Sequence, residues 1–234
     1  IDTYIDELSR LCLSPYYNSG VMNCLEESAS GRQEELDKQR QIEDYLRQVM
    51  ITPRKDILRV YILADSVYSS SKSGHIGLNS NYESEEWYLT ARSTNDYIFL
   101  PAHSETDGGS SKLVISVAKR LCSLQNSQNT IGVIRVDANY NGIKAVCDRI
   151  SVRKGGALFI MDSNWTPVYT NSKLVSAVPT DELKAAAETI GYSKQKLGHS
   201  EFIINVESIP STGWHVIAVN ASSLITKNAN VTLL

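Results

Sequence analysis

The spacing of apolar and polar residues predicts that one structural unit occurs twice in the chain. The apolar run Ile131–Val136 ends in Asp137, and the pattern of Asn139–Ile150 is helical, so a buried strand followed by a helix is predicted. Near the C-terminus, Val216–Ala221 repeats residues 133–138 almost type for type. A short segment that could be helical follows this second copy as well.

A second correspondence lies earlier in each half of the chain. Val60–Ser69 and Leu158–Thr170 both contain an apolar strand, an Asp, a turn, and a second strand that carries Val-Tyr. The Asp residues are Asp65 and Asp162. Two correspondences in the same order predict two related modules in tandem.

The N-terminal region is predicted to be helical. Apolar residues recur at helical spacing up to Cys12, Ser14-Pro15 ends this pattern, and Pro15 can open the next helix. Gln33–Met50 then forms a longer amphipathic helix, which Thr52-Pro53 ends. Such a helix can serve as a rod for dimerisation or can pack on a sheet, and the two uses are compatible.

Most of the remaining chain is predicted to form antiparallel sheet with helices on its faces, so the fold class is α+β. We expect a helical region over 1–53, a first module over 54–150 and a second over 151–234. Ser/Gly/Asn-rich turns are expected at Ser69–Ser80 and Thr106–Ser111, and a helix at Thr180–Ile190. The predicted strands are Leu58–Ala64, Val67–Ser69, Tyr97–Leu100, Leu113–Leu121, Thr130–Asp137, Ala157–Asp162, Val168–Asn171, Glu201–Ser208 and Trp214–Val219.

Charge and hydropathy exclude several classes of protein. The formal net charge is -3 and no basic block is present, so nucleic-acid binding is not expected. No apolar run approaches the roughly 18 residues that a membrane span needs, and no signal peptide is evident. Because the chain begins at Ile1 rather than Met, we expect it to be an excised piece whose flanking membrane spans lie outside it.

No motif for catalysis, a cofactor or a metal is found. The 4 cysteines form no C-x-x-C pair, and the 4 histidines lie far apart in unrelated contexts. Free thiols are expected, while a loop closed by Cys12 and Cys24 in an oxidising compartment remains the alternative. We therefore expect no metal, no cofactor and no enzymatic activity in this chain.

Two positions in the first module are candidates for a ligand site. Trp87-Tyr88 places two large aromatics in a polar, turn-rich segment, where neither strand alternation nor a helical stripe explains them. They either cover a sheet face or line a cavity. Asp137 is either the N-cap of the following helix or a buried acceptor for a polar ligand, and Arg135 shares its face of the strand.

These features, taken in order, resemble those of double Cache domains. The carriers of the resemblance are Trp87-Tyr88 with Ala91, the strand Val114–Ala118, Ile131–Val136 with Asp137, Gly156–Tyr169, and Gly213-Trp214. Double Cache domains are tandem PAS-like modules on a long N-terminal helix, found outside the membrane in bacterial sensor kinases and chemoreceptors. The broken helical region at Ser14-Pro15 is most similar to that of sensor histidine kinases of Gram-positive bacteria.

The resemblance implies a ligand site in the membrane-distal module, here 54–150, with 151–234 as the membrane-proximal module. In the amino-acid-sensing members, an Arg two residues before the Trp binds the ligand carboxylate, and an Asp at the end of the last distal strand binds its amine. This chain has Glu85 at the Arg position, while Trp87, Tyr88 and Asp137 are kept. His103 falls near a position where those members carry a Tyr.

The sequence thus predicts the extracytoplasmic sensing domain of a two-component histidine kinase, at the extracellular face of a bacterial plasma membrane, as a homodimer. A chemoreceptor domain, or a secreted solute-binding or partner-binding protein, is the alternative. The predicted ligand is polar, sugar-like or cationic. The predicted ligand-binding residues are Glu85, Trp87, Tyr88, His103, Arg135 and Asp137.

Overall fold

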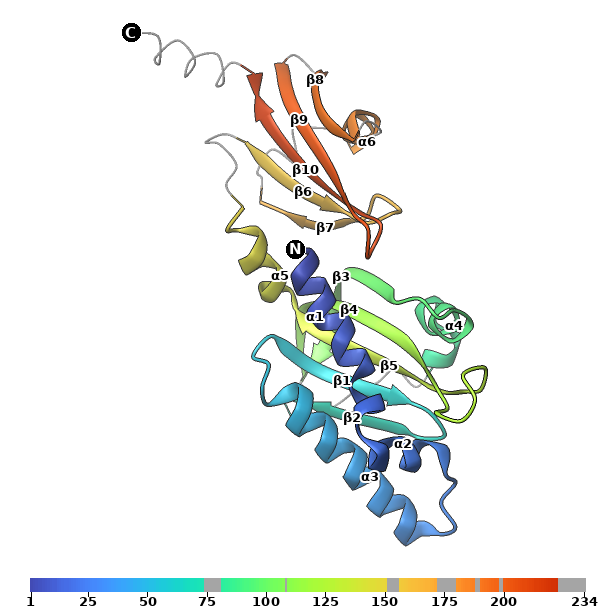
Figure 1. Ribbon diagram of the computed structural model, residues 1–234. Helices are drawn as coiled ribbons and strands as arrows, with labels where there is room; N and C mark the ends of the chain where they lie inside the picture. The colour runs from blue at the N-terminus through green and yellow to red at the C-terminus, as the bar shows by residue number, and fades with distance from the viewer. Residues whose placement is uncertain are drawn as a thin grey trace. The chain divides into compact units, whose positions relative to one another are not determined.

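The computed structural model describes residues 1–73, 81–107, 109–150, 156–171, 180–187, 190–197 and 200–222. The chain divides into two compact units, Thr3–Ile143 and Lys144–Leu234, and each contains one five-stranded sheet (Figure 1). The α+β prediction is therefore confirmed. Among the described helices, none is long and apolar enough to cross a membrane.

The first sheet has the strand order β2-β1-β5-β4-β3, and every neighbouring pair is antiparallel. Its strands lie close to the predicted positions, although β3 and β4 extend into the segment predicted as a turn. The turn predicted over Ser69–Ser80 lies largely outside the described residues. The strands are β1 (Ile57–Leu63), β2 (Val67–Ser71), β3 (Ile98–Asp107), β4 (Ser110–Cys122) and β5 (Thr130–Asn139).

The second sheet repeats this arrangement with the strand order β7-β6-β10-β9-β8. The paired hairpins β1-β2 and β6-β7, and the central strands β5 and β10, are the elements whose sequences correspond, so the predicted tandem repeat is confirmed. The bounds are β6 (Ala157–Met161), β7 (Pro167–Thr170), β8 (Gly191–Leu197), β9 (Ser200–Ile209) and β10 (Trp214–Ala221).

Strand β8 was not predicted. It is the edge strand of its sheet, and Tyr192, Lys194 and Lys196 on one of its faces are exposed. A strand that buries so little carries no apolar alternation that would reveal it.

The turn between β6 and β7 is organised by Asp162, which accepts the N–H groups of Asn164 and Thr166 at 2.8 and 2.7 Å.

The helices follow the predicted order with one correction. The segment around Trp87-Tyr88, expected to be turn-rich, contains the helix α4 (Glu86–Ser93) after a 3-10 turn, η3 (Tyr82–Ser84). Only Tyr88 and Ala91 of α4 are buried, and two positions three apart are too few to show a helical period. The other helices are α1 (Asp2–Leu13), η1 (Ser14–Tyr17), α2 (Ser19–Glu26), α3 (Arg32–Leu46), the π-helical turn η2 (Arg47–Ile51), α5 (Tyr140–Cys147) and α6 (Thr180–Ala187).

The two faces of the first sheet are covered by different helices. Tyr88 and Ala91 of α4 pack on Tyr61, Ala118 and Val133, which we call the α4 face. Strand alternation places the buried residues Val60, Ile62, Ile134 and Val136 on the opposite face. Helix α1 crosses this opposite face in Figure 1, and its Cys12 thiol lies 3.8 Å from the carbonyl oxygen of Val117.

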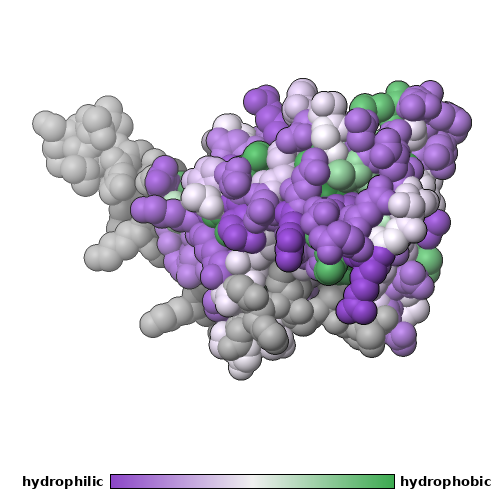
Figure 2. All heavy atoms as spheres, turned by 90° about the horizontal axis from the view of Figure 1, so that it is seen from below, coloured by the Kyte–Doolittle hydropathy of each residue, from purple (hydrophilic) through white to green (hydrophobic). Residues whose placement is uncertain are grey.

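In the second unit, α6 covers one face of the sheet, with Leu183 in the core. On the side of the molecule drawn in Figure 2, hydrophobic residues form only small separate patches among hydrophilic ones.

The cysteines Cys12, Cys24, Cys122 and Cys147 are all free thiols, as expected. The alternative of a Cys12–Cys24 disulfide is not realised.

Helix α3 is fixed to the β1-β2 turn by a buried lysine. Lys38 lies in the buried stripe of α3, and its Nζ donates to Asp65 Oδ2 at 2.6 Å and to the Glu27 carbonyl at 3.0 Å. The same ammonium group lies 5.7 Å from the centre of the Tyr68 ring. The side chain of Lys38 is 6% exposed and that of Asp65 is 50% exposed. The pair therefore anchors α3 on the first sheet.

We predict that Asp65→Ala lowers the free energy of unfolding by about 1–3 kcal/mol, because it leaves the buried Lys38 ammonium without its carboxylate. Lys38→Met should cost less, since Asp65 can then be solvated. Urea denaturation of both single variants and the double variant measures the coupling.

Asp44→Ala is the control for this pair. Asp44 and Arg47 form an ion pair at 3.1 Å with both side chains more than half exposed, so the loss should stay below about 0.5 kcal/mol. Strict additivity of the Lys38 and Asp65 losses would contradict the anchoring role.

Candidate functional site

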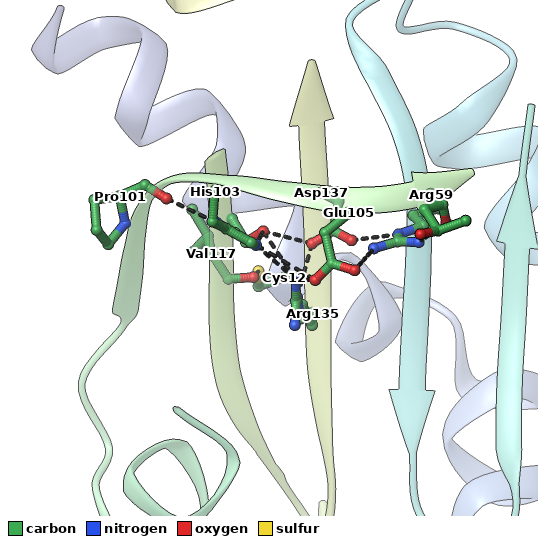
Figure 3. A network of polar contacts seen from close by, with 10 residues as sticks. Cys12, Arg59, Pro101, His103, Glu105, Val117, Arg135 and Asp137 are labelled. Atoms are coloured by element: carbon green, nitrogen blue, oxygen red, sulfur yellow. Dashed lines mark hydrogen bonds and ion pairs between the residues drawn. The ribbon is translucent and has the colours of Figure 1, made fainter. Parts of the chain in front are cut away.

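A buried carboxylate, Asp137, lies at the centre of a polar network on the α4 face of the first sheet (Figure 3). Its side chain is 0% exposed and accepts hydrogen bonds from three side chains. Arg59 Nε donates to Oδ2 at 2.5 Å, while Arg135 Nε and Ser116 Oγ donate to Oδ1 at 2.7 and 2.5 Å. Both carboxylate oxygens thus accept hydrogen bonds from the protein's own side chains.

The register of three neighbouring strands produces this arrangement. Arg59 on β1 is the cross-strand partner of Asp137 on β5, and Ser116 on β4 is the partner of Asp137 on its other side. Directly opposed residues have side chains on the same face about 5 Å apart. Arg135 is two residues before Asp137 and therefore points to the same face.

Strand β3 supplies the outer part of the network through a bulge. The pairing of β3 with β4 shifts register between Leu100 and His103, where Pro101 stands on this edge strand. The Pro101 carbonyl lies 2.7 Å from His103 Nδ1, which fixes this nitrogen as the donor. His103 Nε2 is then the acceptor and lies 2.9 Å from an Arg135 nitrogen, NH2.

Glu105 joins the two arginines from the solvent side. Its carboxylate accepts from Arg59 NH2 at 2.6 Å and from Arg135 NH2 at 2.5 Å, so it lies between them in Figure 3. Two arginines and two carboxylates balance each other's charge. The side chains of Glu105 and His103 are 26% and 28% exposed, whereas those of Arg59 and Arg135 are 2% and 5% exposed.

These surroundings shift the pKa of Glu105 and both arginines. Burial raises the pKa of Glu105, but the charges of Arg135 and Arg59 and the hydrogen bond from Arg59 outweigh it and lower the pKa well below its usual range. Burial lowers the pKa of Arg135, but Asp137 and Glu105 raise it overall. Glu105 and both arginines therefore remain charged in the folded protein at neutral pH.

Aromatic rings border the network. The Trp87 ring of α4 lies over the Arg135 guanidinium, with 4.7 Å between Cζ and the ring centre, and Arg59 Cζ lies 5.2 Å from the Tyr61 ring centre. Both distances are typical of cation–π contacts. The Tyr61 hydroxyl is buried and has no hydrogen-bond partner among the described residues.

The structure brings together four of the six predicted site residues. Arg135, Asp137 and His103 are joined by hydrogen bonds, and Trp87 lies over Arg135. Tyr88 is instead 6% exposed and packs in the apolar cluster with Tyr61.

Tyr88 also lines a cavity that is separate from the charged network. This cavity of about 200 Å³ lies at the other end of β5, where Arg92, Leu63 and Gly132 contribute to its lining. Glu85 is the residue before α4, and its carbonyl accepts the N–H groups of Tyr88 and Leu89. Glu85 therefore lies on a different element from the strands that carry the charged network.

The alternative that Asp137 caps the following helix is wrong. Strand β5 continues to Asn139, and Asn139 Oδ1 accepts the N–H of Asn141 at 2.9 Å at the start of α5. Asp137 lies inside the strand and is bonded to arginines. Asp137 is instead a buried acceptor, the other alternative, and its donors are side chains of the protein itself.

Three members of the network were missed by the sequence analysis. Arg59 interrupts an otherwise apolar strand, and this interruption, matched by Asp137 in another apolar strand, is the signal that could have identified the pair. Glu105 was missed because β3 was predicted to end at Leu100. Ser116 lies in an apolar strand and gives no distinguishing pattern. Among the described residues, no cluster of side chains suited to a metal ion is present.

Comparison with known proteins identifies the family. A family model described as "Cache domain" matches residues 1–229. The chain belongs to the Cache domain family. Cache domains are extracytoplasmic sensory modules of membrane receptors, and they bind ligands without catalysing a reaction. No curated protein sequence is similar enough to this Cache domain to count as a relative.

Solved structures with the same fold come from bacterial chemoreceptors. The ligand-binding domain of Campylobacter jejuni chemoreceptor Tlp3, in complex with 4-methylisoleucine, has a TM-score of 0.68 at 17% identity, covering 97% of this chain and 86% of that one. The corresponding domain of Pseudomonas fluorescens CtaA, in complex with L-isoleucine, gives 0.63 at 15% identity, covering 97% and 88%. That of Pseudomonas aeruginosa amino acid chemoreceptor PctC, in complex with GABA, gives 0.58 at 13%, covering 93% and 98%. At these identities, the likeness shows the fold.

We predict that Glu105→Gln lowers the free energy of unfolding at pH 7 by about 1–3 kcal/mol, because a neutral amide replaces a carboxylate that accepts from two arginines. Since the folded-state pKa of Glu105 is lowered, its contribution is present above the unfolded value of about 4.3 and is lost progressively as the pH falls from there towards the folded value. The difference between wild type and variant should therefore shrink on acidification. Urea denaturation at pH 7, 5 and 3 measures it.

Glu83→Gln, at an exposed position near α4, is the control and should change stability by less than about 0.5 kcal/mol at each pH. A Glu105→Gln loss that stays constant from pH 7 to 3 would contradict the ion-paired role of Glu105.

Proposed function

We propose that this Cache domain senses a small molecule outside the cytoplasm for a transmembrane signalling receptor. The observation that carries the proposal is the set of partly exposed groups Trp87, His103 and Glu105 above the buried charges on the α4 face. An aromatic face, an imidazole ring and a carboxylate next to one another are typical of a site for a polar ligand. In this proposal the first unit is the membrane-distal, ligand-binding module and the second is membrane-proximal.

The proposed ligand is polar, with hydroxyl or cationic groups that donate to Glu105 beside the His103 ring. The related domains of Tlp3 and CtaA are described with bound amino acids, and amino acids are therefore included among the candidates. Glu85 argues against a ligand held mainly by its carboxylate, since it stands where amino-acid-sensing members carry an Arg. A sugar-like or cationic compound fits the exposed acceptors better.

The proposed receptor is a homodimeric histidine kinase at the extracellular face of a bacterial plasma membrane, and the broken N-terminal helical region around Ser14-Pro15 supports this choice. A chemoreceptor is the alternative output, supported by the structural relatives. In both cases α3, anchored by Lys38 and Asp65, would help to transmit changes in the first unit. The proposal requires the ligand to favour one of two arrangements, since equal affinity for both would shift nothing.

A second candidate function is recognition of a partner protein without a small ligand. The observation that favours it is the closure of the charged layer by the protein's own side chains, with Asp137 0% exposed. A partner protein would then contact the partly exposed residues Trp87 and Glu105.

Calorimetric titration against a panel of amino acids, amines, sugars and polyols tests the proposed function. We predict that at least one polar compound binds to wild type, and that Trp87→Ala weakens this binding about tenfold or more because an aromatic contact is lost. His103→Ala should weaken it as well, because the partly exposed ring beside Glu105 is lost.

Leu89→Ala is the control, because Leu89 is on the same helix and is 54% exposed. It should leave affinity unchanged. If no compound of the panel binds, or if Trp87→Ala and Leu89→Ala behave alike, the small-molecule site is not where we propose, and partner recognition becomes the better reading.

A further inference from the structure

The Arg135 guanidinium is surrounded in the way that a bound organic cation would be. Its Nε donates to Asp137, and its NH2 group lies at hydrogen-bond distance from Glu105, His103 and, at 3.4 Å, Ser116 Oγ. The Trp87 ring covers one side of the planar group. These five groups, which we call the cage, come from four separate elements, α4, β3, β4 and β5.

The position of Arg135 is unusual for a charged residue. Its cross-strand neighbours on the α4 face are Tyr61 and Ala118, and Val133 precedes it on the same face, all in the buried cluster under α4. An apolar side chain would fit this row without any desolvation cost. The buried Tyr61 hydroxyl in the same row has no partner among the described residues, which marks polar space that the protein's own groups leave incompletely satisfied.

The charges of the cage require a cation at this point. Arg59 binds the second oxygens of Asp137 and Glu105, and Arg135 binds the first ones. Without Arg135, two carboxylates would share one arginine, and the buried site would carry one uncompensated negative charge. A guanidinium or ammonium group restores the balance, whereas an anion or a neutral molecule does not.

We propose that Arg135 is an internal ligand: it occupies the cation-binding position of the site on the α4 face, and the site takes small organic cations when this side chain is absent or displaced. The inference deepens the proposed function, since it names the ligand class as guanidinium or ammonium compounds. It also gives Arg135 a regulatory role, because a cationic ligand must compete with it. Competition lowers the apparent affinity by the fraction of molecules in which Arg135 has left.

Chemical rescue of Arg135→Ala tests this proposal. The variant leaves the carboxylates and the Trp87 face in place and opens space for a guanidinium ion. Thermal unfolding is followed in 20 mM guanidinium chloride and in 20 mM sodium chloride. We expect guanidinium to raise the Tm of Arg135→Ala by about 3 °C or more relative to sodium, because it binds only the folded variant. Wild type should show no such rise, since its cage is filled.

Arg135→Met is the matched control, because its side chain fills the same space without a charge, and guanidinium should leave its Tm unchanged. An equal effect of guanidinium and sodium on Arg135→Ala would overturn the proposal, as would an equal rise for Arg135→Met. If Arg135→Ala does not fold, Arg135→Ser opens the same space while its hydroxyl can bond to Asp137, and it is judged by the same criterion.

The outcome is separable from that of the proposed function. Rescue of Arg135→Ala, together with a wild type that binds nothing in the metabolite panel, would support the cation cage and argue against a sensing role. A metabolite that binds to wild type, together with no rescue, would support the sensing role and remove Arg135 as an internal ligand.

Discussion

The α4 face of the first sheet depends on one constraint, the burial of the Asp137 carboxylate. A carboxylate that is fully removed from water must be compensated, because the cost of burying an unpaired charge far exceeds the few kcal/mol by which a domain is stable. Arg59 and Arg135 provide the compensation and are themselves balanced by Glu105. A buried ion pair is weak evidence for high stability. Here, however, the pairing of Arg59 with Asp137 depends on strand register. A slip of one residue between β1 and β5 would move Arg59 to the opposite face and leave Asp137 unpaired.

The same constraint arranges the site in two layers. The inner layer consists of Asp137 and the two arginines, which are buried and fixed by the sheet. The outer layer consists of His103 and Glu105, carried by the edge strand β3 beyond its bulge, and of Trp87 on α4. A ligand at this face would first meet the outer layer, and its binding would reach the inner layer only through Glu105 and Arg135. Since Glu105 contacts both Arg135 and Arg59, a change at the surface can alter contacts on β1, β3 and β5 together.

The sequence was sufficient to predict the tandem repeat, because residues 133–138 and Val216–Ala221 have nearly the same order of apolar and polar residue types. It was also sufficient to place Arg135 and Asp137 on one face, since that follows from strand alternation alone. It did not reveal Arg59 or Glu105, because register between distant strands is set by tertiary packing. The helical state of α4 was missed for another reason. Only two of its residues are buried, and the sheet on which they pack forms only in the folded chain.

Slow hydrogen exchange of the arginine Nε–H groups, measured by ¹⁵N NMR at neutral pH, tests whether Asp137 and its two arginines form a buried network in solution. We predict two strongly protected signals from Arg59 and Arg135, both lost in Asp137→Asn. The Nε–H of Arg54, which donates to Asp56 at 2.9 Å, should be unchanged in that variant and serves as an internal reference. If the Arg59 and Arg135 signals exchange as fast in wild type as those of exposed arginines such as Arg40, the buried network around Asp137 does not exist in solution.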